Sequence, residues 1–131
     1  MSQRFGIDTS ILVRLLTGDP EDGFESCRSA LTALVEGGAE VFASNQVIGE
    51  AYVAVQHHYG VAKAEARAAL SDVLGSGLVS PLNGAGVFSA LEAVGGCGLL
   101  DRLIADEYDR AGLVTLTLDR RMAGLAETRL L

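Results

Sequence analysis

Four acidic side chains stand where a carboxylate is costly to place: Asp8, Glu50, Asp101 and Asp119. Asp8 ends the apolar run RFGID, and Asp119 ends the apolar run LVTLTLD. Glu50 interrupts the apolar segment NQVIGEAYVAV, and Asp101 opens the segment DRLIADEYDRAG. Burying or half-burying a carboxylate costs several kcal/mol unless it is paired or bound to a cation. The four acids together therefore predict a divalent-metal site.

The ligand types indicate which metal this site would take. Carboxylates with few histidines or cysteines nearby are hard oxygen ligands, which suit Mg²⁺ or Mn²⁺ rather than zinc. Such a cation activates water as a nucleophile and stabilises charge on a phosphodiester. Thr117 lies two residues before Asp119, so both side chains point the same way in an extended strand. We expect the Thr117 hydroxyl to hold a water or a phosphate oxygen.

Each acid also has a purely structural interpretation. Asp8 can be the N-cap of the next helix, Asp101 a first-turn charge that favours the helix dipole, and Asp119 the start of a turn. Glu50 is the hardest to explain in this way, because its neighbours three and four residues away on a helix are largely apolar. A buried glutamate without a partner is uncommon. The combination of the four is more informative than any one of them.

Basic residues accompany the acids. Arg14, Arg102, Arg120 and Arg121 lie within one or two helical turns of Asp8, Asp101 or Asp119. They are candidates for contacts with substrate phosphates, and simple ion pairs with the acids are the alternative. Three further acids follow Asp101 on the same helix and are expected to form a solvated face, with the first of them in reserve for a wider site: Asp106, Glu107 and Asp109.

The chain alternates strand-like and helix-like segments. Glycines mark the ends of the first three helices, and Asp19 and Pro20 are the predicted N-cap and first residue of the second. Ser44 or Asn45 is the predicted cap of the third. Strands are predicted at 4–8, 40–44, 78–81 and 113–119, with an edge strand at 128–131. Helices are predicted at 9–18, 20–36, 45–59, 61–77, about 85–94, 101–112 and 120–127.

This order of elements predicts the fold class. Short strands separated by helices indicate a parallel sheet covered on both faces, a three-layer α/β/α domain with a central parallel sheet. The length of 131 residues fits a single domain, residues 1–131. Ligand sites in such sheets lie beyond the carboxyl ends of the strands. We therefore expect the four acids to converge on one edge.

Composition limits the environment and the partners. The longest apolar runs are far shorter than a membrane span, and no signal-peptide segment precedes the first strand, so a cytoplasmic protein is expected. Cys27 and Cys97 are expected to be reduced and to fill small core spaces. The net charge of −7 argues against a protein that coats nucleic acid by bulk electrostatics. An enzyme that acts on nucleic acid at a metal-charged pocket remains compatible with it.

Four motifs carry a resemblance to a known family: GIDTSILVRLLTGD, VIGEAYVAV, LLDRLIA and TLTLDRRM resemble those of PIN-domain proteins, and most closely of VapC-type toxins. The resemblance implies a Mg²⁺- or Mn²⁺-dependent endoribonuclease, the toxin of a type II toxin–antitoxin pair. It implies a catalytic, metal-binding quartet of Asp8, Glu50, Asp101 and Asp119, with Thr117 in the hydroxyl position. RNA as substrate, a homodimer and a cognate antitoxin are implied as partners. One departure is that Arg102, rather than a small residue, follows Asp101, behind the glycine-rich stretch GGCG.

Two other functions are compatible with such a scaffold. One is a non-catalytic PIN-like module that binds a partner. The other is phosphoryl transfer through an aspartyl phosphate, which is disfavoured because Ser10 stands where a phosphatase needs a second aspartate. A receiver domain would need a lysine after a late strand, and Lys63 is the only lysine.

Overall fold

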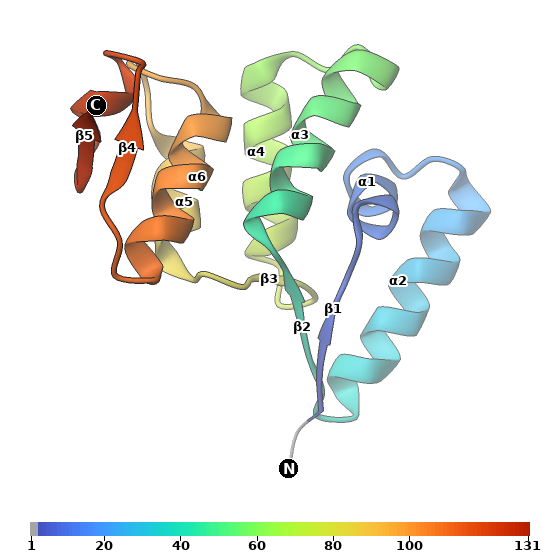
Figure 1. Cartoon of the computed structure of the whole chain (residues 1–131). Helices are drawn as coiled ribbons and strands as arrows, with labels where there is room; N and C mark the ends of the chain where they lie inside the picture. The colour runs from blue at the N-terminus through green and yellow to red at the C-terminus, as the bar shows by residue number, and fades with distance from the viewer. Residues whose placement is uncertain (1–2) are drawn as a thin grey trace. The chain divides into compact units, whose positions relative to one another are not determined.

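The computed structural model describes residues 3–131, which divide into two compact units, one ending at Leu82 and the other formed by Asn83–Leu131 (Figure 1). Within the described residues, six α-helices alternate with five short strands and one 3₁₀ helix. All strand pairs in them are parallel, so the predicted parallel α/β class is confirmed. No helix in this described part is long and apolar enough to cross a bilayer.

The first unit is built on a three-stranded sheet. Its strands are β1 (Arg4–Gly6), β2 (Glu40–Ala43) and β3 (Ser80–Pro81), hydrogen-bonded in the order β1-β2-β3. Gly6 lies opposite Phe42 in the parallel register of β1 and β2. The strands are short and their carboxyl ends are level, so the helices that follow β1 and β2 begin at the same edge of the sheet.

Four helices complete this unit: α1 (Thr9–Thr17), α2 (Glu21–Glu36), α3 (Asn45–Tyr59) and α4 (Lys63–Leu74). Helix α1 packs against each of the other three. The core of the first unit contains fully buried aliphatic side chains from α1, α3, α4 and the segment before β3: Leu12, Ile48, Leu70 and Val79. The predicted glycine stop after α1 is confirmed, since Gly18 has the left-handed φ of 68° that side chains with a Cβ rarely adopt.

The start of α2 differs by one residue from the prediction. Pro20, not Asp19, is the N-cap, with an extended ψ of 152°. Its carbonyl accepts the first helical hydrogen bond, from the backbone N–H of Phe24 at 2.8 Å. Proline is compatible with this place because an N-cap needs no intrahelical N–H donor.

The second unit contains α5 (Ala85–Glu92), α6 (Leu99–Arg110), β4 (Thr115–Thr117), the 3₁₀ helix η1 (Met122–Gly124) and β5 (Thr128–Leu130). Strands β4 and β5 form a parallel pair, and α5 packs against α6. The strand predicted at 113–119 and the helix predicted at 120–127 are both shorter than expected. The causes are local. Before the strand, the Leu113 N–H donates to the Tyr108 carbonyl, and after it the Asp119 side chain accepts the backbone N–H groups of Arg121 and Met122.

Candidate functional site

Asp8 joins the first strand to the first helix. It is the N-cap of α1, and its Oδ1 accepts hydrogen bonds from the Ser10 hydroxyl at 2.5 Å and from the Ile11 backbone N–H at 3.3 Å. The Ser10 hydroxyl first, and the Ile11 amide next, lower the pKa of Asp8 below its usual value. The carboxylate is exposed. Both of these bonds use Oδ1, and a carboxylate anchored by one oxygen in this way can present the other to a cation.

Glu50 does not lie on an apolar face, and that expectation was wrong. The buried stripe of α3 includes Ile48, Ala51, Tyr52 and Val55, which recur at helical spacing, and Glu50 falls outside it and is exposed. An exposed glutamate keeps its hydration, so its place in α3 costs little without a partner. The cost of burying a carboxylate therefore no longer argues that Glu50 binds a metal. The remaining indication of such a role is its position on α3.

Asp8 and α3 start from the same edge of the first unit. Gly6 pairs with Phe42 across the two strands. Asp8 lies two residues after Gly6, and Ser44 lies two residues after Phe42, so the two residues stand at the same level of the sheet. Ser44 caps α3, and its hydroxyl accepts the Val47 N–H at 3.2 Å. Figure 1 shows α1 and α3 continuing from the same ends of β1 and β2, and the two helices pack against each other. Two of the four acids thus lie on helices that leave one edge of this sheet.

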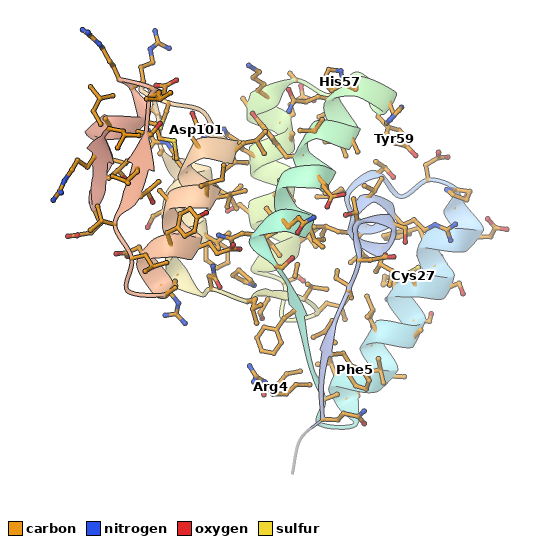
Figure 2. The ribbon with its side chains drawn as sticks, viewed as in Figure 1. Arg4, Phe5, Cys27, His57, Tyr59 and Asp101 are labelled. Carbon is orange, nitrogen blue, oxygen red and sulfur yellow. The ribbon has the colours of Figure 1, made fainter. Side chains whose placement is uncertain are left out.

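Asp101 lies in the first turn of α6 in the second unit (Figure 2). Its carboxylate is half-buried, and it makes no ion pair with any described residue. The N-cap of the helix, Gly98, has no side chain that could cap the backbone. A first-turn carboxylate interacts favourably with the positive end of the helix dipole. The place of Asp101 in α6 therefore also fits its structural interpretation as a first-turn charge.

Asp119 organises the turn after β4. Its Oδ1 accepts the backbone N–H groups of Arg121 at 2.8 Å and Met122 at 3.0 Å, while its own N–H donates to the Thr117 hydroxyl at 3.0 Å. Asp119 is exposed and Thr117 is half-buried. These bonds end the strand at Thr117 and start η1. Asp119 therefore has the arrangement seen at Asp8, with Oδ1 used by the backbone.

Asp101 and Asp119 lie toward the same end of the second unit. The chain reverses after α6, where the Leu113 N–H donates to the Tyr108 carbonyl at 2.9 Å. Helix α6 rises about 1.5 Å per residue and β4 about 3.3 Å per residue in the opposite direction. The twelve residues of α6 and the few residues from Thr115 to Asp119 therefore cover similar lengths. Helix α6 and β4 also pack against each other.

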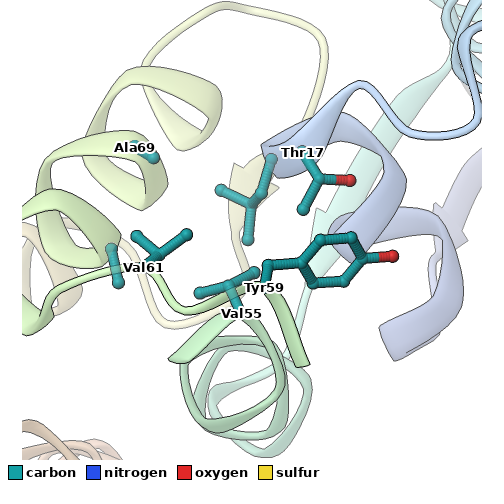
Figure 3. A pocket seen from close by; sticks show the side chains of 7 residues that line it. Thr17, Val55, Tyr59, Val61 and Ala69 are labelled. Carbon is teal, nitrogen blue, oxygen red and sulfur yellow. The ribbon is translucent and has the colours of Figure 1, made fainter. Parts of the chain in front are cut away.

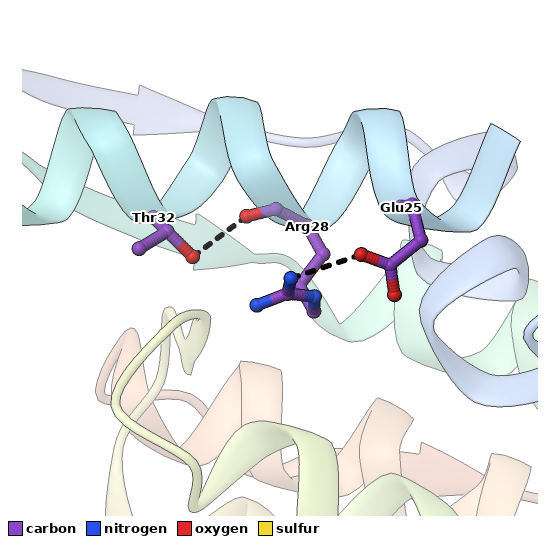
Figure 4. Close-up of polar contacts among 3 residues, drawn as sticks. All are labelled: Glu25, Arg28 and Thr32. Atoms are coloured by element: carbon purple, nitrogen blue, oxygen red, sulfur yellow. Dashed lines mark hydrogen bonds and ion pairs between the residues drawn. The ribbon is translucent and has the colours of Figure 1, made fainter. Parts of the chain in front are cut away.

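The candidate arginines do not pair with these acids. Two ion pairs of the described residues are Arg4 with Glu40 at 3.8 Å and Arg28 with Glu25 at 2.9 Å, both on the surface. In the second pair (Figure 4), the hydrogen bond lowers the pKa of Glu25 and raises the pKa of Arg28. The alternative of ion pairs for Arg14, Arg102, Arg120 and Arg121 is therefore not realised in this structure.

Two of those arginines have other neighbours in the structure. The guanidinium of Arg14 lies over Gly23 at the start of α2, where its Nη1 would be 2.7 Å from an added Cβ. The guanidinium of Arg102 donates to two backbone carbonyls, those of Gly95 and Cys97. Arg120 and Arg121 are exposed beside Asp119.

Asp106 is not part of a solvated face, contrary to expectation. It is half-buried, and its Oδ2 accepts a hydrogen bond from the Asn83 side-chain amide at 3.4 Å. Its Oδ1 lies so close to Gly86 of α5 that an added Cβ there would overlap it. The sequence does indicate that Asp106 is partly buried, because Asp106 continues the helical spacing of buried Leu99 and Leu103 along α6.

An apolar pocket of about 230 Å³ lies in the first unit, where α1, α3 and α4 meet (Figure 3). None of the four candidate acids lines it. Its walls are mainly aliphatic, with the Tyr59 ring at one side: Leu16, Thr17, Val55, Tyr59, Val61, Ala66 and Ala69. This pocket lacks the oxygen ligands that a magnesium or manganese site needs.

The four acids suit a divalent metal by the chemistry of their donor atoms rather than by an assembled site. Asp8 and Glu50 belong to the first unit, and Asp101 and Asp119 to the second, so neither unit by itself holds three of the four. In the described residues, no group of three or more acidic, histidine or cysteine side chains is placed to hold a metal. The side chains themselves are hard oxygen donors, three of them exposed, and this set suits Mg²⁺ or Mn²⁺. The convergence of all four on one edge remains a prediction.

Comparison with known proteins identifies the class. A family model described as PIN domain matches residues 6–128. Since this match covers most of the chain and all four motifs, the chain belongs to the PIN-domain family. PIN domains are typically metal-dependent nucleases that use divalent cations. No curated protein and no solved structure gave a significant match.

Proposed function

We propose that this protein is a Mg²⁺- or Mn²⁺-dependent endoribonuclease and the VapC-type toxin of a type II toxin–antitoxin pair. The observation that carries the proposal is the family match over residues 6–128, within which acids stand at the motif positions Asp8, Glu50, Asp101 and Asp119. Because the match runs through both compact units, we propose that residues 1–131 act as a single PIN domain.

In this proposal the four carboxylates act together as the metal ligands. The anchored Oδ1 atoms of Asp8 and Asp119 fix the direction of each side chain, so that Oδ2 is presented without a further loss of rotamer freedom. A bound cation supplies charge that stabilises the phosphodiester during cleavage and activates water for the attack. The Thr117 hydroxyl already accepts the Asp119 N–H, so its proton is directed to another oxygen, that of a water or a phosphate.

The partners follow from the same proposal. Arg14, Arg120 and Arg121 are exposed and are proposed to contact phosphates of the RNA. A cognate antitoxin and a homodimer complete the proposal and are supported by the resemblance to VapC-type toxins alone. A cytoplasmic location is proposed because the apolar runs of the sequence are far shorter than a membrane span.

The decisive experiment compares wild type with Asp8→Asn in cleavage of a panel of cellular RNAs with Mg²⁺, Mn²⁺ or chelator. Asparagine keeps an Oδ1 acceptor for the α1 cap but removes the negative charge. We expect cleavage to require metal and to fall at least about 100-fold in Asp8→Asn, since even outer-shell changes at metal sites cost about 10- to 100-fold. Asp109→Asn, an exposed acid on α6, is the matched control and should cleave as wild type.

Metal binding gives a second readout that needs no RNA. A ligand that binds only the folded state raises stability by about 2.7 kcal/mol at 100 times its Kd. We therefore expect millimolar Mn²⁺ to raise the thermal midpoint of wild type and Asp109→Asn but not of Asp8→Asn. Absence of both cleavage and a midpoint shift in wild type would favour a non-catalytic binding module.

A further inference from the structure

The segment that leads into α6 has a backbone that needs to be held in place. Gly95 and Gly96 both have left-handed φ angles, 75° and 70°, and Gly98 follows as the N-cap of α6. Consecutive left-handed residues are open to glycine but costly for others, and a glycine-rich segment loses much backbone entropy when it is ordered. Something other than the segment itself must therefore stabilise this conformation.

Arg102 supplies that stabilisation. Its Nε–H donates to the Cys97 carbonyl at 3.2 Å, and its Nη2 donates to the Gly95 carbonyl at 2.8 Å. The guanidinium lies over Gly96, where an added Cβ would be 3.2 Å from Nη2. Hydrogen bonds from a charged donor are stronger than neutral ones, and the flat guanidinium reaches two carbonyls at once. We call this arrangement, Arg102 with Gly95, Gly96 and Cys97, the arginine clamp.

The clamp holds the turn of α6 that carries Asp101. Arg102 is the next residue in the chain, and its backbone N–H donates to the Gly98 carbonyl at 3.3 Å. The buried side chain of Cys97 also anchors this segment. Gly98 has no capping side chain, and the clamp holds the segment in front of the helix through the carbonyls of Gly95 and Cys97. The two sequence departures beside Asp101, the arginine and the glycine-rich stretch, thus depend on each other.

We propose that Arg102 is a positioning residue for Asp101, acting through the clamp rather than by binding substrate phosphate. The inference rests on the proposed nuclease function. It predicts that loss of the clamp weakens metal binding and lowers kcat while the affinity for RNA stays the same. A phosphate contact would have the opposite signature, weaker RNA binding with metal binding unchanged.

The test uses Arg102→Gln and Arg102→Lys in the full chain, with Arg110→Gln as the matched control from the exposed last turn of α6. Three quantities are measured: the Mn²⁺ concentration for half of the thermal-midpoint shift, kcat for RNA cleavage, and amide exchange of residues 95–101. For Arg102→Gln we expect faster exchange, about a 10-fold higher half-saturating Mn²⁺ and a lower kcat. Arg102→Lys should be intermediate, because one ammonium cannot reproduce the guanidinium fork.

Gly96→Ala offers an independent route that retains Arg102. A Cβ at this left-handed position meets the guanidinium, so its effect on half-saturating Mn²⁺ should have the same direction. If Arg102→Gln matches Arg110→Gln in metal response and kcat while wild type is active, the clamp proposal is wrong and the nuclease proposal stands. Weaker RNA binding as the main effect also overturns the clamp proposal. A wild type without any metal response overturns both.

Discussion

At the residue scale, Asp8 and Asp119 share one arrangement in two different units. Each follows a strand, and the Oδ1 of each accepts two hydrogen bonds from the segment that comes next. At both places the structural interpretation, a cap or a turn, is therefore correct. The same bonds also orient the second oxygen, so the structural and the metal-binding interpretations are compatible within one side chain.

The Ser10 hydroxyl makes a testable contribution to this arrangement. An aspartate in an unfolded chain has a pKa of about 3.9, and the pKa of Asp8 lies lower in the folded protein chiefly because of Ser10. A depressed pKa adds stability above the unfolded pKa, and this stability is lost as pH falls through the folded pKa. Ser10→Ala should raise the pKa of Asp8, and its stability deficit should be full at neutral pH and shrink in acid.

Carboxyl NMR titration and urea denaturation at several pH values measure the two effects. Ser10→Thr keeps a hydroxyl and is the control, with a pKa close to that of wild type. An Asp8 pKa that is the same in Ser10→Ala and wild type would contradict the assigned cause.

At the element scale, the contact of α5 with α6 depends on a carboxylate rather than on apolar packing alone. Asp106 of α6 lies against Gly86 of α5 and accepts a hydrogen bond from Asn83. A side chain at residue 86 would have to displace a half-buried, hydrogen-bonded group. Gly86 is therefore the residue that permits this approach of the two helices.

This contact predicts that Gly86→Ala lowers the stability of the protein, although Gly→Ala in a helix usually raises it. In an open helix, Gly→Ala stabilises by up to about 1 kcal/mol. Gly86→Ala should instead destabilise the protein by about 1–3 kcal/mol, the typical cost of overpacking. Urea denaturation of Gly86→Ala, Asp106→Ala and the double variant forms a cycle, in which Gly86→Ala should cost much less once Asp106 is removed. Equal costs in both backgrounds would show that the overlap with Asp106 is not the cause.

The sequence predicted most elements because their ends depend on local chemistry. Gly18 and Ser44 act through their own backbone or side chain, so residue type alone locates the helix ends. The role of Arg102, by contrast, depends on contacts that spacing does not encode. The partners of Arg102 are backbone carbonyls, which every residue has. Asp106 is different, because its spacing from buried Leu99 and Leu103 does place it toward the covered side of α6. Glu50 was misplaced because apolar neighbours in sequence do not establish which face of a helix is covered.

At the scale of the whole molecule, acidic residues exceed basic ones in both units. Five basic and ten acidic residues precede Asn83, and five basic and seven acidic residues follow from there on, which accounts for the net charge of −7. Such a protein repels RNA at long range. Binding must then depend on a few arginines and on the metal rather than on a broad basic surface.

The salt dependence of RNA binding tests this expectation. Each phosphate contact with a single strand contributes a slope of about −0.7 to the logarithm of affinity against the logarithm of salt concentration, so contacts from Arg14, Arg120 and Arg121 predict a total near −2. The measurement is fluorescence anisotropy with Asp8→Asn protein, which leaves the RNA intact. Adding Arg121→Gln should make the slope shallower by about 0.7, whereas Arg102→Gln should leave it unchanged. A slope steeper than about −5 would indicate a broad basic surface instead.

The double use of Asp8 and Asp119 also constrains how a chain of this kind can change over evolutionary time. If the nuclease activity were lost, selection would no longer maintain the negative charge at these two positions. It would still maintain an Oδ1-like acceptor, because α1 and η1 both begin with a hydrogen bond to it. Asparagine or serine keeps such an acceptor, and alanine gives up about 0.5–2 kcal/mol of folding stability. Inactive descendants should therefore drift at these two positions toward small polar residues, whereas exposed Glu50, which holds no backbone group, is free to become almost anything.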